Sequence, residues 1–255
     1  MNRSRFTAAM LGAALVCCGL CGCGPSTVGE CLEQGAAAAN SADWQRALKL
    51  ASRGVRLAPD NVDALLLKAV AAWRCGKLEE ALAAATRAAD IDSGNFTARY
   101  TQGRIAMAMP GHRAEAVAAL RAALKLRRGD RDTLIELCNL GAEENSPDTL
   151  GFLKLLAVDP EFAESPALYN QLGVEYLRRK DLTRAKRAFM TAWKLDKNDP
   201  VITYNIACFF DRYTASPRVA ARLYGDYLRL TAGDAAAEPT RKVAAARLEV
   251  LGGAR

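Results

Sequence analysis

The chain has 255 residues, with 35 Lys and Arg against 28 Asp and Glu, and 51% of its residues are hydrophobic. That hydrophobic share is sufficient for a folded core and excludes an intrinsically disordered chain. A single histidine, His112, excludes a multi-histidine metal site, and the low aromatic content together with abundant alanine favours helix over sheet. Eight cysteines would suit a disulfide framework, but four of them fall within seven residues near the N-terminus.

The N-terminal segment has the order of an export signal. A basic start containing Arg3 and Arg5 precedes an uncharged apolar run over residues 6–16, and no further charge occurs before Glu30. This order is typical of a secretory signal peptide. The apolar run is too short to span a bilayer, which needs about 20 apolar residues in a helix.

The end of this segment, Leu-Cys-Gly-Cys at residues 20–23, resembles the lipobox of bacterial lipoproteins. The resemblance implies cleavage before Cys23 and attachment of a diacylglycerol to its thiol. We therefore expect residues 1–22 to be a lipoprotein signal peptide and residues 23–28 to be a lipidated tether. An ordinary signal peptide and an uncleaved anchor are the alternatives.

The rest of the chain repeats with a period of about 34 residues, which is the period of a helix-turn-helix repeat. Small residues mark the period, with steps of 34 and 35 residues in the first series and 34 in the second: Ala47, Ala81 and Ala116, then Gly35, Ala69 and Gly103.

The clearest copy combines Tyr169, Leu172, Gly173 and Tyr176 on one helix with Ala185, Phe189 and Ala192 on the next. This pattern resembles the tetratricopeptide repeat. The resemblance implies an all-α fold, a right-handed superhelical solenoid of helix-turn-helix repeats with a concave groove and a C-terminal capping helix. Small residues are expected where the two helices of a repeat approach most closely, at Ala69, Gly103, Gly173 and Ala207.

About six repeats are expected over residues 29–235, and residues 236–255 are expected to form the capping helix and a tail. The fourth repeat is the weakest, because Pro147 and Pro160 disturb its spacing. The predicted repeat starts are Gly29, Val62, Phe96, Arg131, Pro166 and Pro200.

No enzymatic motif accompanies these repeats, so we expect neither catalysis nor a cofactor nor a bound metal. His112 is predicted to be a solvated turn residue. The four cysteines that remain after Cys23, namely Cys31, Cys75, Cys138 and Cys208, are expected to be small buried hydrophobic residues. A disulfide between Cys31 and Cys75 is the one local alternative.

Basic residues cluster at positions 121–131 and 178–187. A nucleic-acid partner would suit this charge, but the export signal argues against it. The clusters are expected to be solvated helix faces, with an acidic envelope partner as the alternative.

By resemblance to the family, a protein or peptide partner would lie in the groove against residues of the first helices. The candidate groove residues are Leu66, Trp73, Tyr100, Arg104, Asn139, Asn170, Tyr204 and Asn205. Packing is an equal alternative for each of them.

These observations predict a lipid-anchored, non-enzymatic scaffold of the bacterial cell envelope that takes part in the assembly of an envelope complex. It would attach to the membrane through its lipid, and we expect no small-molecule substrate. Gly24 follows the expected lipidated cysteine, and a residue of this kind at that position resembles the lipoproteins found at the periplasmic face of an outer membrane. The alternatives are a soluble exported repeat protein without a lipid, or a helical envelope enzyme or regulator of cell-wall enzymes.

Overall fold

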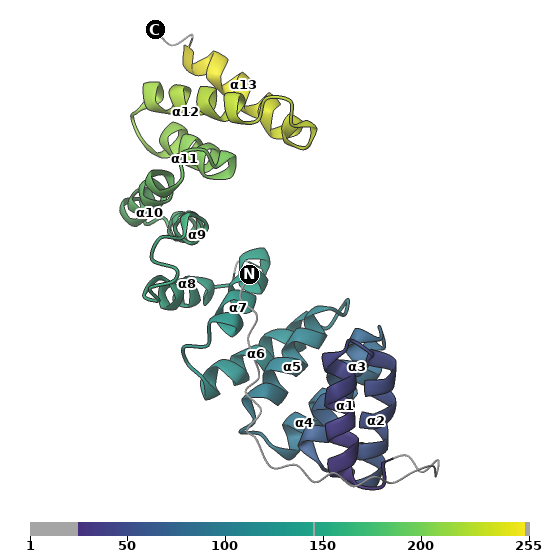
Figure 1. Cartoon of the computed structure of the whole chain (residues 1–255). Helices are drawn as coiled ribbons and strands as arrows, with labels where there is room; N and C mark the ends of the chain where they lie inside the picture. Colours follow the sequence, from purple (N-terminus) through teal and green to yellow (C-terminus); the bar gives the residue numbers. More distant parts are fainter. Residues whose placement is uncertain (1–24, 145, 253–255) are drawn as a thin grey trace.

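The computed structural model describes residues 25–144 and 146–252, so the expected signal peptide and Cys23 lie outside the described residues. Within those ranges the chain forms thirteen α-helices and one short 3-10 helix, and no strand occurs in this part of the chain. The prediction of an all-α solenoid is confirmed. The helices stack into an elongated, curved array with α1 at one end and α13 at the other (Figure 1).

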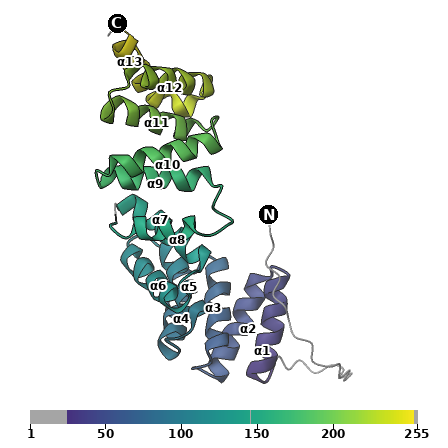
Figure 2. The same cartoon turned by 90° about the vertical axis from the view of Figure 1, so that its left-hand side faces the viewer.

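Helices α1 to α12 form six antiparallel pairs, one for each repeat, and α13 follows the last pair (Figure 2). The first helices are α1 (Val28–Asn40), α3 (Val62–Arg74), α5 (Phe96–Met107), α7 (Arg131–Glu144), α9 (Pro166–Arg178) and α11 (Pro200–Tyr213). The second helices are α2 (Trp44–Leu57), α4 (Leu78–Ile91), α6 (Arg113–Leu126), α8 (Thr149–Ala157), α10 (Leu182–Leu195) and α12 (Pro217–Leu230). A 3-10 helix at Ala235–Ala237 leads into α13 (Glu238–Gly252).

Local sequence explains where the first helices begin. Five of the six predicted repeat starts are the first residues of these helices, and Gly29 is the second residue of α1. A polar residue precedes each of these five starts, and its side chain accepts a hydrogen bond from the backbone N–H three residues later, which satisfies an otherwise unpaired donor. These capping residues are Asn61, Asn95, Asp130, Ser165 and Asp199.

The expected small residues do lie at the closest helix contacts. Ala69 and Ala207 are fully buried. A Cβ atom added to Gly103 would lie 2.7 Å from Cγ of Leu120, so α5 and α6 could not approach as closely with any larger residue. Gly173 has the same relation to Phe189 between α9 and α10.

The fourth repeat departs most from the pattern, as its prolines predicted. Its second helix, α8, has only nine residues. Arginines from neighbouring repeats hold the loop before α8, because Arg179 donates from Nη2 to the Pro147 carbonyl oxygen at 2.7 Å and Arg121 pairs with Asp148. The backbone of α7 approaches α5 and α9 less closely than the other first helices approach one another.

The capping helix α13 is fixed by a buried carboxylate. Asp211 on α11 accepts two hydrogen bonds from Arg247 on α13, at 2.9 and 2.8 Å, and a third from the Tyr224 hydroxyl at 3.1 Å. Arg241 adds a hydrogen bond from Nη1 to the Thr231 hydroxyl at 2.8 Å. The last repeat is thereby covered by a helix, as a solenoid end requires.

All four cysteines in the described part of the chain are free. Cys31 and Cys138 are buried as expected, whereas Cys75 and Cys208 are half-buried. The alternative of a Cys31–Cys75 disulfide is not realised, since Cys31 lies in the first turn of α1 and Cys75 follows the last turn of the neighbouring helix α3. Burial, with a smaller effect of the nearby Glu175, raises the pKa of Cys138 to about 12, which suits an inert thiol.

Candidate functional site

The eight candidate groove residues all lie on first helices, and we call the side of the stack that these helices form the first-helix face. Its most connected part is centred on Arg104 of α5. The Arg104 guanidinium lies 5.2 Å from the centre of the Trp73 ring on α3 and 5.8 Å from that of Tyr100. Its Nε is 3.6 Å from Oε1 of Glu136 on α7. The Arg104 cluster therefore joins three successive repeats.

Tyr100 of this cluster also packs against a second aromatic ring on α5. Its ring stacks on Phe96 one helical turn earlier, with ring centres 5.6 Å apart and an angle of 10° between the ring planes. Desolvation by burial raises the pKa of Tyr100 above its ordinary value. An exposed arginine between two ordered aromatic rings is a typical anchor at protein interfaces.

A second polar group lies further along the first-helix face. The Asn205 side chain on α11 donates a hydrogen bond to Oδ1 of Asn170 on α9, at 3.0 Å. Asn139 on α7 is exposed between the two groups. Amides of this kind can hydrogen-bond the backbone of an extended peptide. Leu66 differs from them, because it packs against the buried Leu65 and its neighbours.

Tyr204 lies in the contact between helices. Its ring centre is 5.0 Å from that of Tyr227 and 6.1 Å from that of Tyr224, both on α12. Burial, with a smaller contribution from Cys208, raises the pKa of Tyr204 to about 12. Its exposed edge lines a cavity that α11 and α12 share with the segment leading into α13. The packing role that we set beside partner binding is thus evident for Tyr204.

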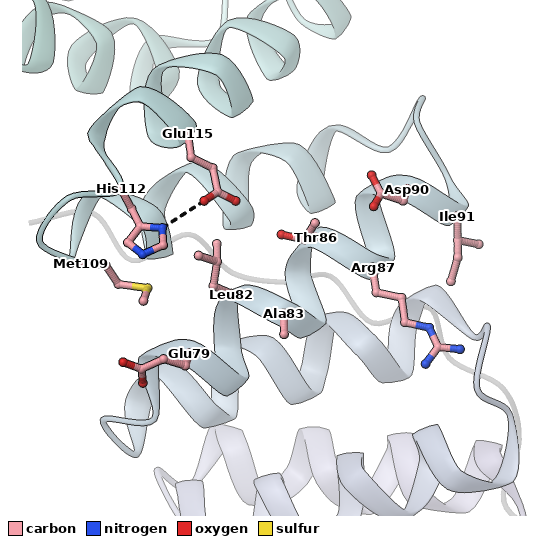
Figure 3. A pocket seen from close by; sticks show the side chains of 10 residues that line it. All are labelled: Glu79, Leu82, Ala83, Thr86, Arg87, Asp90, Ile91, Met109, His112 and Glu115. Carbon is pink, nitrogen blue, oxygen red and sulfur yellow. Dashed lines mark hydrogen bonds and ion pairs between the residues drawn. The ribbon is translucent and has the colours of Figure 1, made fainter.

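His112 lies at the start of α6 and is partly exposed. Its Nδ1 is 3.1 Å from Oε2 of Glu115, and both line a pocket between α4 and α6 (Figure 3). The residues that line this pocket include no serine or cysteine, and the Thr86 hydroxyl accepts a hydrogen bond from Gln102. The contact between His112 and Glu115 is typical of a helix start, because the helix dipole stabilises a carboxylate near the helix N-terminus.

Several residues of the basic clusters are structural. The carboxylate of Glu175 on α9 is buried and accepts hydrogen bonds from Arg178 and Arg179, each at 2.5 Å. Arg131 pairs with Asp159, with 2.7 Å between Nε and Oδ2. The prediction that the basic clusters are solvated helix faces is therefore incomplete for Arg131, Arg178 and Arg179, which form ion pairs. Over the residues that the structure describes, no group of three or more metal-binding side chains comes together.

The comparisons with known proteins agree with this architecture. Residues 166–199, which span α9 and α10, match the family model of the tetratricopeptide repeat. No curated protein matches the chain. The solved structure of YrrB, described as a tetratricopeptide repeat protein with an unusual peptide-binding site, has 18% identity and a TM-score of 0.63, over 75% of this chain and 97% of that one. MamA from Desulfovibrio magneticus RS-1 has 18% identity and a TM-score of 0.58, over 68% of this chain and 97% of that one.

Identities this low establish the fold alone. The fold is that of the tetratricopeptide repeat solenoids, an architecture suited to scaffolds for protein–protein interaction. In the described ranges, no helix has both the length and the apolar character needed to cross a membrane.

Proposed function

We propose that this protein is a non-enzymatic scaffold that binds a protein or peptide partner on its first-helix face. The observation that carries the proposal is the Arg104 cluster, which presents an arginine and two ordered aromatic rings across three repeats. The exposed Asn139 and the Asn170–Asn205 pair continue this surface with hydrogen-bonding groups suited to an extended backbone. No feature of the described residues favours the enzymatic alternative.

The test of partner binding is a photo-crosslinking residue placed at Asn139 in intact cells. We expect it to capture a discrete partner. The purified partner should bind Trp73→Ala/Arg104→Ala about 30-fold or more weakly, since the loss of even one anchor residue costs about 2 kcal/mol. The matched control is Arg56→Ala, an exposed position on α2. If Trp73→Ala/Arg104→Ala and Arg56→Ala bound that partner with equal affinity, the Arg104 cluster would not be part of the binding surface.

We also propose that the scaffold is anchored in the bacterial cell envelope by lipid on Cys23, at the periplasmic face of the outer membrane where the cell has two membranes. The lipobox-like residues 20–23 and the preceding basic and apolar segments support this proposal. Attached acyl chains contribute about 0.8 kcal/mol for each buried methylene, so two or more chains anchor stably.

Replacement of the lipid-bearing thiol tests the anchor directly. Cys23→Ser is expected to abolish metabolic labelling with a fatty acid and to move the protein from the membrane to the soluble fraction. Cys21→Ser, two residues earlier in the same segment, is the control and should keep the label. Labelling retained by Cys23→Ser would refute the assignment of the lipid to this residue.

A further inference from the structure

A cleft of about 570 Å³ lies between the second helices α10 and α12, on a part of the surface that the proposed function does not use. Helix α11 lies between these two helices (Figure 2) and forms the floor of the cleft with the buried residues Ile206 and Phe210. Leu223 of α12 is also buried, and Trp193 of α10 is half-buried beside the floor. Val219 on the α12 side is 42% exposed.

The rim of this cleft is basic. Exposed side chains of Lys186, Arg218 and Arg222 line it, and its lining contains no acidic residue. Lys186 lies over the Phe210 ring, with Nζ 5.8 Å from the ring centre. Arg222 has a carboxylate partner, Asp226, whose Oδ2 is 3.8 Å from Nε of Arg222. Lys186 and Arg218 form no ion pair among the described residues. We call this site the basic cleft.

Two other clefts between second helices lack this combination. The pocket between α4 and α6 (Figure 3) has three acidic residues, Glu79, Asp90 and Glu115, in its lining. The cleft between α6 and α8 is basic, but its lining includes a carboxylate, that of Asp148, which pairs with Arg121. Among these three clefts, the basic cleft is thus the one that combines basic residues with an apolar floor and has no carboxylate in its lining.

We propose that the basic cleft binds an acidic segment of a partner protein. An aromatic or aliphatic side chain of the segment enters between α10 and α12 and covers Trp193 and Phe210. Carboxylates on either side of it pair with Lys186 and Arg218. Desolvation of the rim by the inserted side chain strengthens these ion pairs, because the local dielectric falls.

The depth of the floor favours a peptide over a membrane surface. The buried apolar atoms lie beneath the exposed cations, so a flat bilayer would meet the charges without reaching Ile206 or Phe210. A protruding side chain can reach both the rim and the floor. The basic rim lies on the second helices α10 and α12, and the cleft shares no lining residue with the candidate groove residues of the first-helix face.

A defined probe tests the proposal on the purified protein. The probe is a fluorescein-labelled peptide in which Glu alternates with Leu and Phe, and its counterpart has Lys in place of every Glu. Anisotropy should show binding of the acidic peptide alone. Lys186→Glu/Arg218→Glu should weaken binding by about tenfold or more, while Lys186→Arg/Arg218→Lys should keep it, since charge complementarity dominates.

The matched control is Arg187→Glu/Lys194→Glu, which makes the same change in net charge at exposed positions of α10 outside the cleft. It should weaken binding by less than about twofold. In a Trp44→Phe/Trp73→Phe variant, Trp193 is the sole tryptophan of the chain, and its emission should shift to the blue when the peptide binds.

Three results would overturn the proposal. The first is an equal loss of affinity in the Lys186/Arg218 and Arg187/Lys194 charge reversals, which would show a general charge effect. The second is an unchanged Trp193 emission at saturating peptide. The third is binding to phosphatidylglycerol vesicles without binding to the peptide, which would assign the cations to a membrane surface.

Discussion

Gly173 permits the closest approach of α9 and α10. A Cβ atom at this position would lie 2.5 Å from Cδ1 of Phe189, which is itself buried. Gly173→Ala must therefore displace the Phe189 ring or separate the helices. We expect it to lower the free energy of unfolding by about 1–3 kcal/mol, the usual cost of overpacking a core. Chemical denaturation followed by circular dichroism measures this change.

Gly225 in the interior of α12 provides the matched control. A Cβ atom there would meet nothing within 4 Å, so Gly225→Ala gains helix propensity without a clash. It should raise the free energy of unfolding by about 0.5–1 kcal/mol. Changes of the same sign in both variants would contradict the role assigned to Gly173.

Sequence spacing predicted these small residues because a close helix contact excludes any larger side chain at one position per repeat. The surroundings of Tyr204 could not be predicted in this way. Counting from the repeat start identifies its helix and its approximate face, but its contacts depend on the size of Tyr224 and Tyr227 on the following helix. The contact of Arg104 with Trp73 likewise depends on the distance between repeats, which no local pattern specifies.

Among the elements, α13 is joined to the last repeat by an ion pair with a buried carboxylate. The carboxylate of Asp211 is only 2% exposed and holds Arg247 through two hydrogen bonds. Arg247→Ala should leave this carboxylate without its main partner and release α13 from the last repeat. Hydrogen exchange should then accelerate in α13 while α1–α4 keep their protection. Arg229→Ala, at an exposed ion pair on α12, is the control and should leave α13 protected.

The same pair makes a pH-dependent contribution to stability. The hydrogen bonds from Arg247 hold the pKa of Asp211 below its ordinary value. Because this folded-state pKa is lower than the unfolded one, near 4, the contribution is complete above that pH and is lost as the pH falls through the folded-state pKa. The wild-type protein should therefore lose more stability than Arg247→Ala between pH 5 and the acid limit of folding, as measured by thermal denaturation. Parallel acid profiles would contradict this role of Asp211.

The helix starts were predictable because each one depends on nearby residues, such as Asp199 before Pro200. The anchoring of α13 was not, since Asp211 and Arg247 are 36 residues apart and belong to different helices. The final helix itself was expected within residues 236–255, where α13 lies. The contact that fixes it is a property of the stacked repeats.

At the scale of the whole molecule, the stack has a large core cluster towards each end and a smaller one between them. One core cluster extends from α1 to α7, and another extends from α9 to α13. A smaller cluster joins them across the fourth and fifth repeats, with Leu134, Leu153, Leu156 and Leu172 among its members. The short α8 supplies two of these leucines. In a solenoid, stability is a sum of repeat and neighbour terms, so weakening one joint can separate the array into units that unfold independently.

Leu153→Ala tests this joint. Leu153 is 2% exposed, and its truncation should cost about 2–5 kcal/mol, concentrated in the contact that links the two units. We expect equilibrium urea denaturation to change from one transition to two, with hydrogen exchange fastest in α7 and α8. Leu155→Ala lies on the same short helix, but this side chain is 48% exposed, so its effect should stay within about 0.5 kcal/mol and leave a single transition. A single, uniformly shifted transition in Leu153→Ala would instead show that the fourth repeat couples the two ends as firmly as the other repeats do, and that the loop contacts of Arg121 and Arg179 compensate for the shortness of α8.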